Sequence, residues 1–211
     1  MTEEKRSELT LKYFRDGGVL YGLVYTTQRG IVALRCALST WFYRRVLARC
    51  GRGTVFRTGI YIAHPRRVEI GENSVIGDDV FLFCEVPGGR LEIGSRTKLW
   101  TGTLVDFSGG VFVGDRVMIS SGVSIRTHDH GYSPHAKPVT HELVIGDEVW
   151  IGSGASILPR VRSIGPGAVI GAASVVTRAV PERAVVAGNP ARIIGYTDGT
   201  LMDSEHDAPV R

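Results

Sequence analysis

The sequence predicts an all-β solenoid, and three observations support this fold class. A six-residue unit recurs between about residue 70 and residue 176, for example in residues 70–75 and 76–81 (IGENSV and IGDDVF) and in residues 145–150 and 151–156 (IGDEVW and IGSGAS). Each unit opens with an aliphatic residue, continues with a small one, and has a small or aliphatic residue at its fifth position. Glycine is abundant, with 27 residues among 211. A period of six fits neither a helix nor a long alternating strand, whereas short repeats are typical of solenoids.

The residue types within the repeat explain how such coils stack. The opening aliphatic residue points inward and lies on its counterpart in the next coil. The fifth residue also faces inward, and it is small or β-branched because the interior is narrow. Gly, Asn and Asp at the second to fourth positions allow the positive φ angles that sharp corners require. One repeat cannot bury its own apolar face, so we expect several stacked coils over residues 53–195.

Residues 1–52 predict a helical arm in front of the solenoid. They contain ten Lys or Arg against four Asp or Glu, a balance of +6, whereas the whole chain carries +4. An approximate apolar stripe runs along the arm through Ile31, Leu34, Leu38, Trp41 and Leu47. Two interpretations remain open: the helix packs on the end of the solenoid, or its basic, apolar surface rests on an anionic membrane. Residues 196–211 are expected to form a polar tail.

Composition and charge exclude several classes of protein. No recognition motif accompanies the basic arm, so we expect no nucleic-acid partner. Arg29 and Arg35 divide the apolar stretch 17–43, which leaves no uncharged piece long enough to cross a bilayer. The three cysteines are far apart and lack the spacing of metal ligands, which favours reduced thiols. Without a recognisable signal peptide, we expect a cytoplasmic protein, with membrane association through the arm left open.

Residues 126–143 interrupt the repeat and predict a long loop projecting from one coil. Four of the six histidines lie in it, at positions 128, 130, 135 and 141. Long loops on rigid scaffolds are often functional. Histidines in such a loop fit two kinds of chemistry: a general base working near neutral pH, or a metal site built from several imidazoles.

The repeats, the histidine-bearing loop, residues 149–153 (VWIGS) and residues 186–192 (VAGNPAR) together resemble the hexapeptide-repeat acyltransferases. This superfamily includes maltose and galactoside O-acetyltransferases, serine acetyltransferase and O-acetyltransferases of polysaccharide biosynthesis. The similarity covers about residues 54–195 and leaves out the arm. It implies a left-handed parallel β-helix, a homotrimer, active sites in the clefts between subunits, and acetyl-CoA as co-substrate without a metal.

The resemblance also implies roles for residues of the loop and the following coil. The family's general base falls on His130 by motif count, and on His128 if the alignment shifts by two. The base takes the proton of the acceptor hydroxyl while that oxygen attacks the thioester directly, with no acyl-enzyme. The backbone N–H of Ser153 matches the family position at the thioester end of coenzyme A, where a fixed donor stabilises the developing oxyanion.

Three further residues are candidates for the acceptor site. Asp106 resembles the family carboxylate that lines this site, although a corner aspartate forming a turn is an equal alternative. Trp150 matches the family's aromatic residue near the acceptor pocket, or is a large residue pointing outward from a coil. Asp129 is a candidate for holding the tautomer of a loop imidazole.

The groove for coenzyme A is expected along the last coils. Gly171 and Ala172 carry little side-chain bulk, so a pantetheine arm can lie on the backbone there. Thr177 and Arg178 match a family Thr-Lys pair near the nucleotide phosphates, with Arg in place of Lys. Asn189 and Arg192 belong to the closing motif.

The resemblance implies an acetyl-CoA-dependent O-acetyltransferase acting on a sugar hydroxyl, in a polysaccharide or glycan precursor. Two alternatives remain open. A metal lyase resembling the γ-class carbonic anhydrases would use His130 and His135, but a third ligand histidine is missing at the expected upstream spacing. A non-catalytic β-helix binding module would show a degenerated loop. O- and N-acetylation are not distinguished by the sequence.

Overall fold

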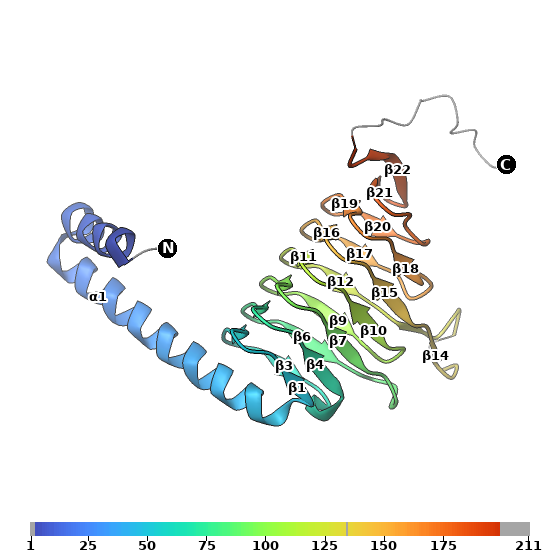
Figure 1. The fold of residues 1–211 in the computed structure, drawn as a ribbon, viewed down its shortest axis with the longest axis horizontal. Coiled ribbons are helices and arrows are strands. Elements are labelled where there is room, and N and C mark those ends of the chain that lie inside the picture. Colours follow the sequence, from blue (N-terminus) through green and yellow to red (C-terminus); the bar gives the residue numbers. More distant parts are fainter. Residues whose placement is uncertain (1–2, 134, 199–211) are drawn as a thin grey trace.

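The computed structural model describes residues 3–133 and 135–198, with side chains of Arg15 and of residues from 18 onward. It consists of one long helix followed by a three-sided parallel β-helix (Figure 1). Helix α1 (Glu3–Val46) is kinked at Gly18, where φ is 76°. That left-handed conformation suits glycine, which has no Cβ.

Each side of the prism is a parallel sheet with one strand from each coil. The first sheet contains, in spatial order, β1 (Arg49–Cys50), β4 (Val68–Ile70), β7 (Leu91–Ile93), β10 (Val111–Val113), β15 (Leu143–Ile145) and β18 (Ser163–Ile164). The second contains β2 (Val55–Phe56), β5 (Val75–Ile76), β8 (Lys98–Leu99), β11 (Met118–Ile119), β16 (Trp150–Ile151), β19 (Val169–Ile170), β21 (Ala184–Gly188) and β22 (Ala191–Tyr196). The third contains β3 (Tyr61–Ile62), β6 (Phe81–Phe83), β9 (Leu104–Asp106), β12 (Ser124–Ile125), β17 (Ser156–Ile157) and β20 (Val175–Val176).

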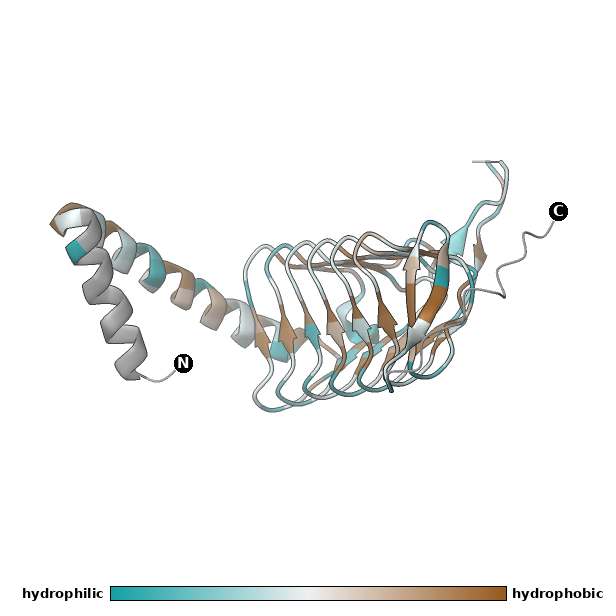
Figure 2. Cartoon of the chain, turned by 90° about the horizontal axis from the view of Figure 1, so that it is seen from above, coloured by the Kyte–Doolittle hydropathy of each residue, from teal (hydrophilic) through white to brown (hydrophobic). Residues whose placement is uncertain are grey.

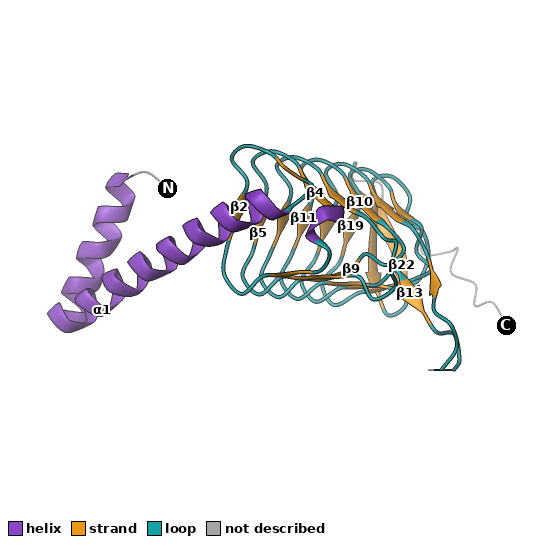
Figure 3. Cartoon of the chain, turned by 90° about the horizontal axis from the view of Figure 1, so that it is seen from below, coloured by secondary structure: helices purple, strands orange, loops and turns teal. Residues whose placement is uncertain are grey.

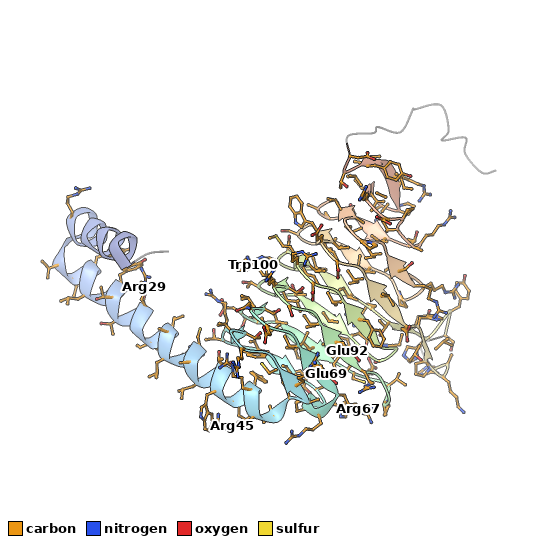
Figure 4. The ribbon with its side chains drawn as sticks, viewed as in Figure 1. Arg29, Arg45, Arg67, Glu69, Glu92 and Trp100 are labelled. Carbon is orange, nitrogen blue, oxygen red and sulfur yellow. The ribbon has the colours of Figure 1, made fainter. Side chains whose placement is uncertain are left out.

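Stacked aliphatic side chains fill the prism as the repeat predicts. Ile76, Leu99, Ile119, Ile151 and Ile170 are successive register partners in the second sheet, and each is at most 1% exposed. Hydrophobic residues therefore recur on the strands from coil to coil (Figure 2). Outward positions are polar or charged in places; Glu69 and Glu92, for example, are register partners on the outer face of the first sheet (Figure 4).

Small residues at the corners let successive coils approach closely. A Cβ added to Gly94 would lie 2.5 Å from the carbonyl carbon of Gly114 in the next coil. Backbone atoms cannot yield easily to such a contact, so the coil spacing depends on glycine at this position.

A ladder of buried hydroxyl groups links three coils at the same corner. The Thr97 hydroxyl donates a hydrogen bond to the Gly114 carbonyl (2.8 Å) and accepts one from the Val117 N–H (3.1 Å). Ser74 bridges Gly94 and Thr97 in the same way, one coil earlier. Both side chains occupy the fifth position of a repeat and are fully buried.

Among the residues whose side chains are described, those in the C-terminal turns of the arm contact the β-helix. The Tyr43 hydroxyl donates to the Ile60 carbonyl (2.7 Å), and its ring stacks on Phe56 with centroids 5.0 Å apart. Thr40 accepts a hydrogen bond from the Phe56 N–H at 3.0 Å. Leu47, just after the helix, is buried, and β1 already begins at Arg49, within the expected arm of residues 1–52.

The rest of α1 extends away from the prism (Figure 1). Ile31, Leu34, Leu38 and Trp41 are all more than half exposed, so the solenoid does not bury these four residues of the predicted stripe. Arg29 and Arg45 lie on this same helix (Figure 4). None of the helices among the described residues is both long enough and apolar enough to cross a membrane.

The loop at residues 126–143 leaves the prism as a short antiparallel hairpin, β13 (His128–Asp129) with β14 (Val139–Thr140), and β13 projects from the coils (Figure 3). After the hairpin the chain returns to the first sheet, where β15 pairs in register with β10. A 3-10 helix, η1 (Pro65–Arg67), joins β3 to β4, and the antiparallel pair β21–β22 ends the second sheet. The predicted tail lies almost wholly outside the described residues.

Replacing Thr97 with Val tests the hydroxyl ladder. The shape of the side chain is nearly kept, but the Gly114 carbonyl and the Val117 N–H lose their buried partner. We expect the free energy of unfolding to fall by about 1–3 kcal/mol, measured by urea denaturation. The matched control is Thr101→Val at an exposed turn position, expected within about 0.5 kcal/mol of the parent. Equal stability of the two variants would contradict the role assigned to the ladder.

Candidate active site

Three polar side chains from successive coils meet at the C-terminal ends of strands in the third sheet. Glu85 follows β6, Asp106 ends β9, and His128 follows β12. Phe83 and Asp106 are register partners, and β12 pairs with β9. Parallel stacking therefore brings residues about 20 positions apart in the chain to one corner.

Asp106 is fully buried and saturated with hydrogen bonds. One carboxylate oxygen accepts from the N–H and the hydroxyl of Ser108. The other accepts from the backbone N–H groups of Thr127 (2.9 Å) and His128 (3.1 Å). Burial alone raises the pKa of this carboxyl, but the hydrogen bonds from Ser108, Thr127 and His128 outweigh it and hold the pKa below its ordinary value. Asp106 is thus an anion inside the corner.

The imidazole of His128 is fixed by this anion. Its Nδ1 lies 2.7 Å from Oδ2 of Asp106, and the side chain is only 8% exposed. Because an ionised carboxylate can only accept, Nδ1 carries a proton, and in the neutral imidazole Nε2 is the nitrogen with the lone pair. Nε2 lies 3.2 Å from Oε2 of Glu85, whose side chain is 60% exposed. This arrangement provides an oriented base whose reactive nitrogen lies next to an exposed carboxylate, which can accept a hydrogen bond from Nε2 when the ring is protonated.

His130 is oriented differently. Its Nδ1 lies 2.8 Å from the carbonyl of Ala136, so this nitrogen also carries the proton. The ring is half-buried, and its centroid lies 5.6 Å from that of His128. His130 therefore lies beside His128, but it is held by the backbone of the loop and not by a buried charge.

The carboxylate of Asp129 has a different set of partners. It accepts from the Gly131 N–H (2.7 Å) and lies 3.7 Å from Nε2 of His141 and 3.6 Å from Nε of Arg160. The Gly131 hydrogen bond, followed by the charges of Arg160 and His141, holds the pKa of Asp129 below its usual value. With His130, these residues line a shallow pocket under the hairpin. The carboxylate that orients a loop imidazole is thus Asp106, whereas Asp129 contacts a different histidine.

Most of the predicted coenzyme A residues lie at another corner, between the second and third sheets. Ser153 and Ala172 are exposed in stacked turns, where the Ala173 N–H donates to the Ser153 carbonyl (2.8 Å). Gly171 lies in the second of these turns, and exposed Asn189 lies in the β21–β22 turn that follows the same sheet. These positions form a row along one edge of the prism.

The remaining predicted residues are distributed around this row. Trp150 is half exposed on β16 and donates to the Ser120 hydroxyl at 3.1 Å. Thr177 and Arg178 follow β20 in the third sheet, and His128 follows β12, which lies two strands away in the same sheet. Arg192 is exposed on β22 and donates to the Ala191 carbonyl. The structure therefore does not bring all candidates together within one chain.

Sequence reasoning missed Glu85, Ser108 and Thr127. Ser108 accepts from the N–H groups of Glu85 and Val86, and Thr127 from the N–H of Gly109, so both tie neighbouring coils to Asp106. Their common signal is a polar residue just after a third-sheet strand in consecutive coils. The Pro-Gly-Gly turn at residues 87–89 interrupts the six-residue phase and hides this alignment.

The fold and this corner define a class of protein, and comparisons with known proteins identify it. No family model matches the chain. It is 30% identical over 161 residues to the putative lipopolysaccharide biosynthesis O-acetyl transferase WbbJ of Escherichia coli, covering 66% of this chain and 77% of that protein. It is 33% identical over 156 residues to the galactoside O-acetyltransferase of Escherichia coli, covering 63% of this chain and 71% of that one.

Solved structures show the same fold. AntD, an N-acyltransferase from Bacillus cereus solved with dTDP and 3-hydroxybutyryl-CoA, has a TM-score of 0.65 at 23% identity, covering 74% of this chain and 86% of that chain. A hexapeptide-repeat acetyltransferase of Vibrio cholerae solved with acetyl coenzyme A has a TM-score of 0.53 at 23% identity, covering 76% and 75%. The chain belongs to the hexapeptide-repeat acyltransferases, and its fold is their left-handed parallel β-helix. It is an enzyme of the acyltransferase class.

The ionised state of Asp106 predicts a pH dependence of stability. The pKa of Asp106 lies below the unfolded value of about 3.9. Its contribution is therefore complete above that value and is lost as the pH falls toward the lower folded-state pKa. We expect the difference in free energy of unfolding between the parent and Asp106→Asn to narrow as the pH falls below about 4, measured by urea denaturation at a series of pH values. A difference that stays constant with pH would contradict an ionised, stabilising Asp106.

Proposed function

We propose that the chain transfers the acetyl group of acetyl-CoA to a hydroxyl of a sugar in a glycan or polysaccharide precursor. The observation that carries this proposal is the Asp106–His128 pair, which presents one imidazole nitrogen as a base. Several relatives support the acceptor class by name, since they include galactoside O-acetyltransferases and proteins named for lipopolysaccharide and colanic acid biosynthesis.

In the proposed reaction, Nε2 of His128 takes the proton of the acceptor hydroxyl as its oxygen bonds to the thioester carbonyl carbon. The tetrahedral intermediate then collapses, the carbon–sulfur bond breaks, and the proton passes from His128 to the departing thiolate. Asp106 stabilises the imidazolium that exists between these steps. The exposed Glu85 carboxylate has to move aside for the hydroxyl to reach Nε2.

Geometry favours His128 over His130 as the base, although motif counting favours His130. His128 is nearly buried and held by a buried carboxylate, while His130 is half-buried and held by a loop carbonyl. A negative partner stabilises the protonated form of a base more than a neutral carbonyl does. We therefore assign proton transfer to His128 and a supporting position beside it to His130.

The positions of Ser153 and His128 support a homotrimer. Ser153 precedes β17, whereas His128 follows β12, and these two strands pair in parallel. The two residues thus lie at opposite ends of the third sheet in one chain. A site that combines them has to join the edge of one subunit to the opposite edge of its neighbour, as the family expectation of clefts between subunits requires.

We propose that acetyl-CoA lies along the row of turns described above. Its thioester would be near the N–H of Ser153, and its pantetheine arm along Gly171 and Ala172. The remaining candidates for this ligand are Thr177, Arg178, Asn189 and Arg192. Trp150 and Asp129 are proposed to border the acceptor.

Substituting the two central histidines tests the assignment. We expect His128→Ala to reduce kcat by about 10²–10⁴-fold, because the general base is lost. His130→Ala is expected to reduce it less than about tenfold. The measurement is thiol release from acetyl-CoA in the presence of a panel of sugars and amino sugars.

The matched control is His135→Ala, an exposed histidine of the same loop, which should retain the parent rate. A greater loss in His130→Ala than in His128→Ala would assign the base to His130. Acetylation of amino sugars alone would replace the O-acetyl proposal by N-acetylation.

We also propose that the chain has three units: the arm of residues 1–52, the β-helix of residues 53–195 and the tail of residues 196–211. The exposed apolar surface and excess basic charge of the arm favour peripheral contact with an anionic membrane. Arg45, for example, lies 4.1 Å from the ring centre of Trp41, an exposed pair of cation and aromatic ring.

The double variant Leu34→Glu/Leu38→Glu tests this contact. Both side chains are exposed, and burying one Leu in lipid is worth about 1.5–3 kcal/mol. We expect binding to anionic vesicles, measured by co-sedimentation, to fall at least about tenfold. Val139→Glu, at an exposed valine on β14, serves as control, and light scattering should give the mass of three chains for all proteins. Unchanged vesicle binding by the double variant would contradict membrane contact through the arm.

A further inference from the structure

Glu85, His128 and His130 form a compact group of metal-ligating side chains. Each offers one ligand atom, and these atoms lie within 4.8 Å of one another. The closest measured pair is Nε2 of His128 and Oε2 of Glu85, at 3.2 Å. The three side chains come from the residues after β6, from β13 and from the turn that follows β13, so both the prism and the hairpin contribute.

The hydrogen bonds behind the two histidines of this group resemble those found at metal sites. Metal-binding histidines usually donate their other ring N–H to a carboxylate or a backbone carbonyl, which fixes the tautomer. His128 has Asp106 on Nδ1 at 2.7 Å, and His130 has the Ala136 carbonyl on Nδ1 at 2.8 Å. In both neutral rings Nε2 is therefore the nitrogen that has the lone pair. A proton-transfer role needs this arrangement for one histidine, but here two adjacent histidines have it.

We propose that Glu85, His128 and His130 bind one Zn²⁺ ion, which inhibits acetyl transfer by occupying the nitrogen that would otherwise accept the proton. Two histidines and one glutamate with a fourth position open form a known zinc ligand set. Ligand bonds of about 2.0–2.1 Å require the three atoms to close in by about one ångström. The exposed Glu85 side chain and the loop position of His130 allow this movement.

The charges also favour a divalent cation. Glu85 supplies one carboxylate in the ligand set, and Asp106 supplies a second behind His128, 2.7 Å from its Nδ1. Imidazole ligands select zinc, copper and nickel, whereas Mg²⁺ prefers a set of oxygen ligands. Zn²⁺ at this site is an inhibitor and not a participant in the reaction, and this consequence rests on His128 being the base proposed above.

The test begins with the full-length protein stripped of metal by a chelator that is then removed. Calorimetry with ZnCl₂ is expected to show one site per chain, and MgCl₂ is expected to show no binding. Glu85→Gln and His130→Gln should each weaken the zinc affinity at least about tenfold. Asp106→Asn should weaken the zinc affinity about 10–100-fold, because it removes the negative charge that holds Nδ1 of His128.

The matched control is His135→Gln, at an exposed histidine of the same loop, and its zinc affinity should equal that of the parent. Absence of a stoichiometric site, or parental affinity in both Glu85→Gln and His130→Gln, would overturn the site. Titration with Co²⁺ gives a second check: a thiolate-to-cobalt charge-transfer band would place the metal on a cysteine and also overturn it.

Inhibition is measured as thiol release with and without ZnCl₂, each variant relative to its own metal-free rate. We expect the zinc concentration for half inhibition to rise at least about tenfold in Glu85→Gln and to stay at the parental value in His135→Gln. Zinc binding without inhibition would overturn the regulatory role. Absence of acetyl transfer in the metal-free parent would instead overturn the proposed function, because the calorimetric result does not depend on turnover.

Discussion

Parallel pairing of each coil with the next is the interaction on which the rest of this structure depends. Strands of only two or three residues are stable here because each one joins a ladder across the coils, such as β5–β8–β11–β16. Close approach of the turns is needed for that pairing, and Gly94 shows why: any side chain there would meet the backbone of Gly114. The six-residue repeat thus reflects the close spacing of the backbone turns as well as the burial of hydrophobic side chains.

The same stacking makes the candidate active site. A buried carboxylate is costly unless its oxygens are fully hydrogen-bonded, and Asp106 obtains its partners from its own coil and from the next one. The hydrogen bond to this carboxylate orients the imidazole of His128. The loop supplies the histidine, but the prism supplies the charge that positions it.

The fold could be predicted from the sequence because the period of six is a local property. Ile76 and Ile151 open their repeats and are buried as expected. The choice between His128 and His130 could not be predicted, because it depends on which imidazole meets Asp106 across a coil boundary more than 20 residues away. Motif counting cannot detect that contact. Likewise, Ser153 and His128 lie at opposite ends of the third-sheet strands because β12 and β17 pair in parallel. The sequence alone does not reveal this strand pairing.

The hairpin at residues 126–143 interrupts the chain without interrupting the prism. Ile125 pairs with Ile157, and Val111 pairs with Leu143, so the coils on either side close over the insertion as though it were absent. The free energy of closing a flexible loop rises by only about 0.6 kcal/mol when its length doubles. The length and sequence of this loop can therefore change with little effect on folding stability in this architecture, while the scaffold keeps the carboxylate that any new histidine would need.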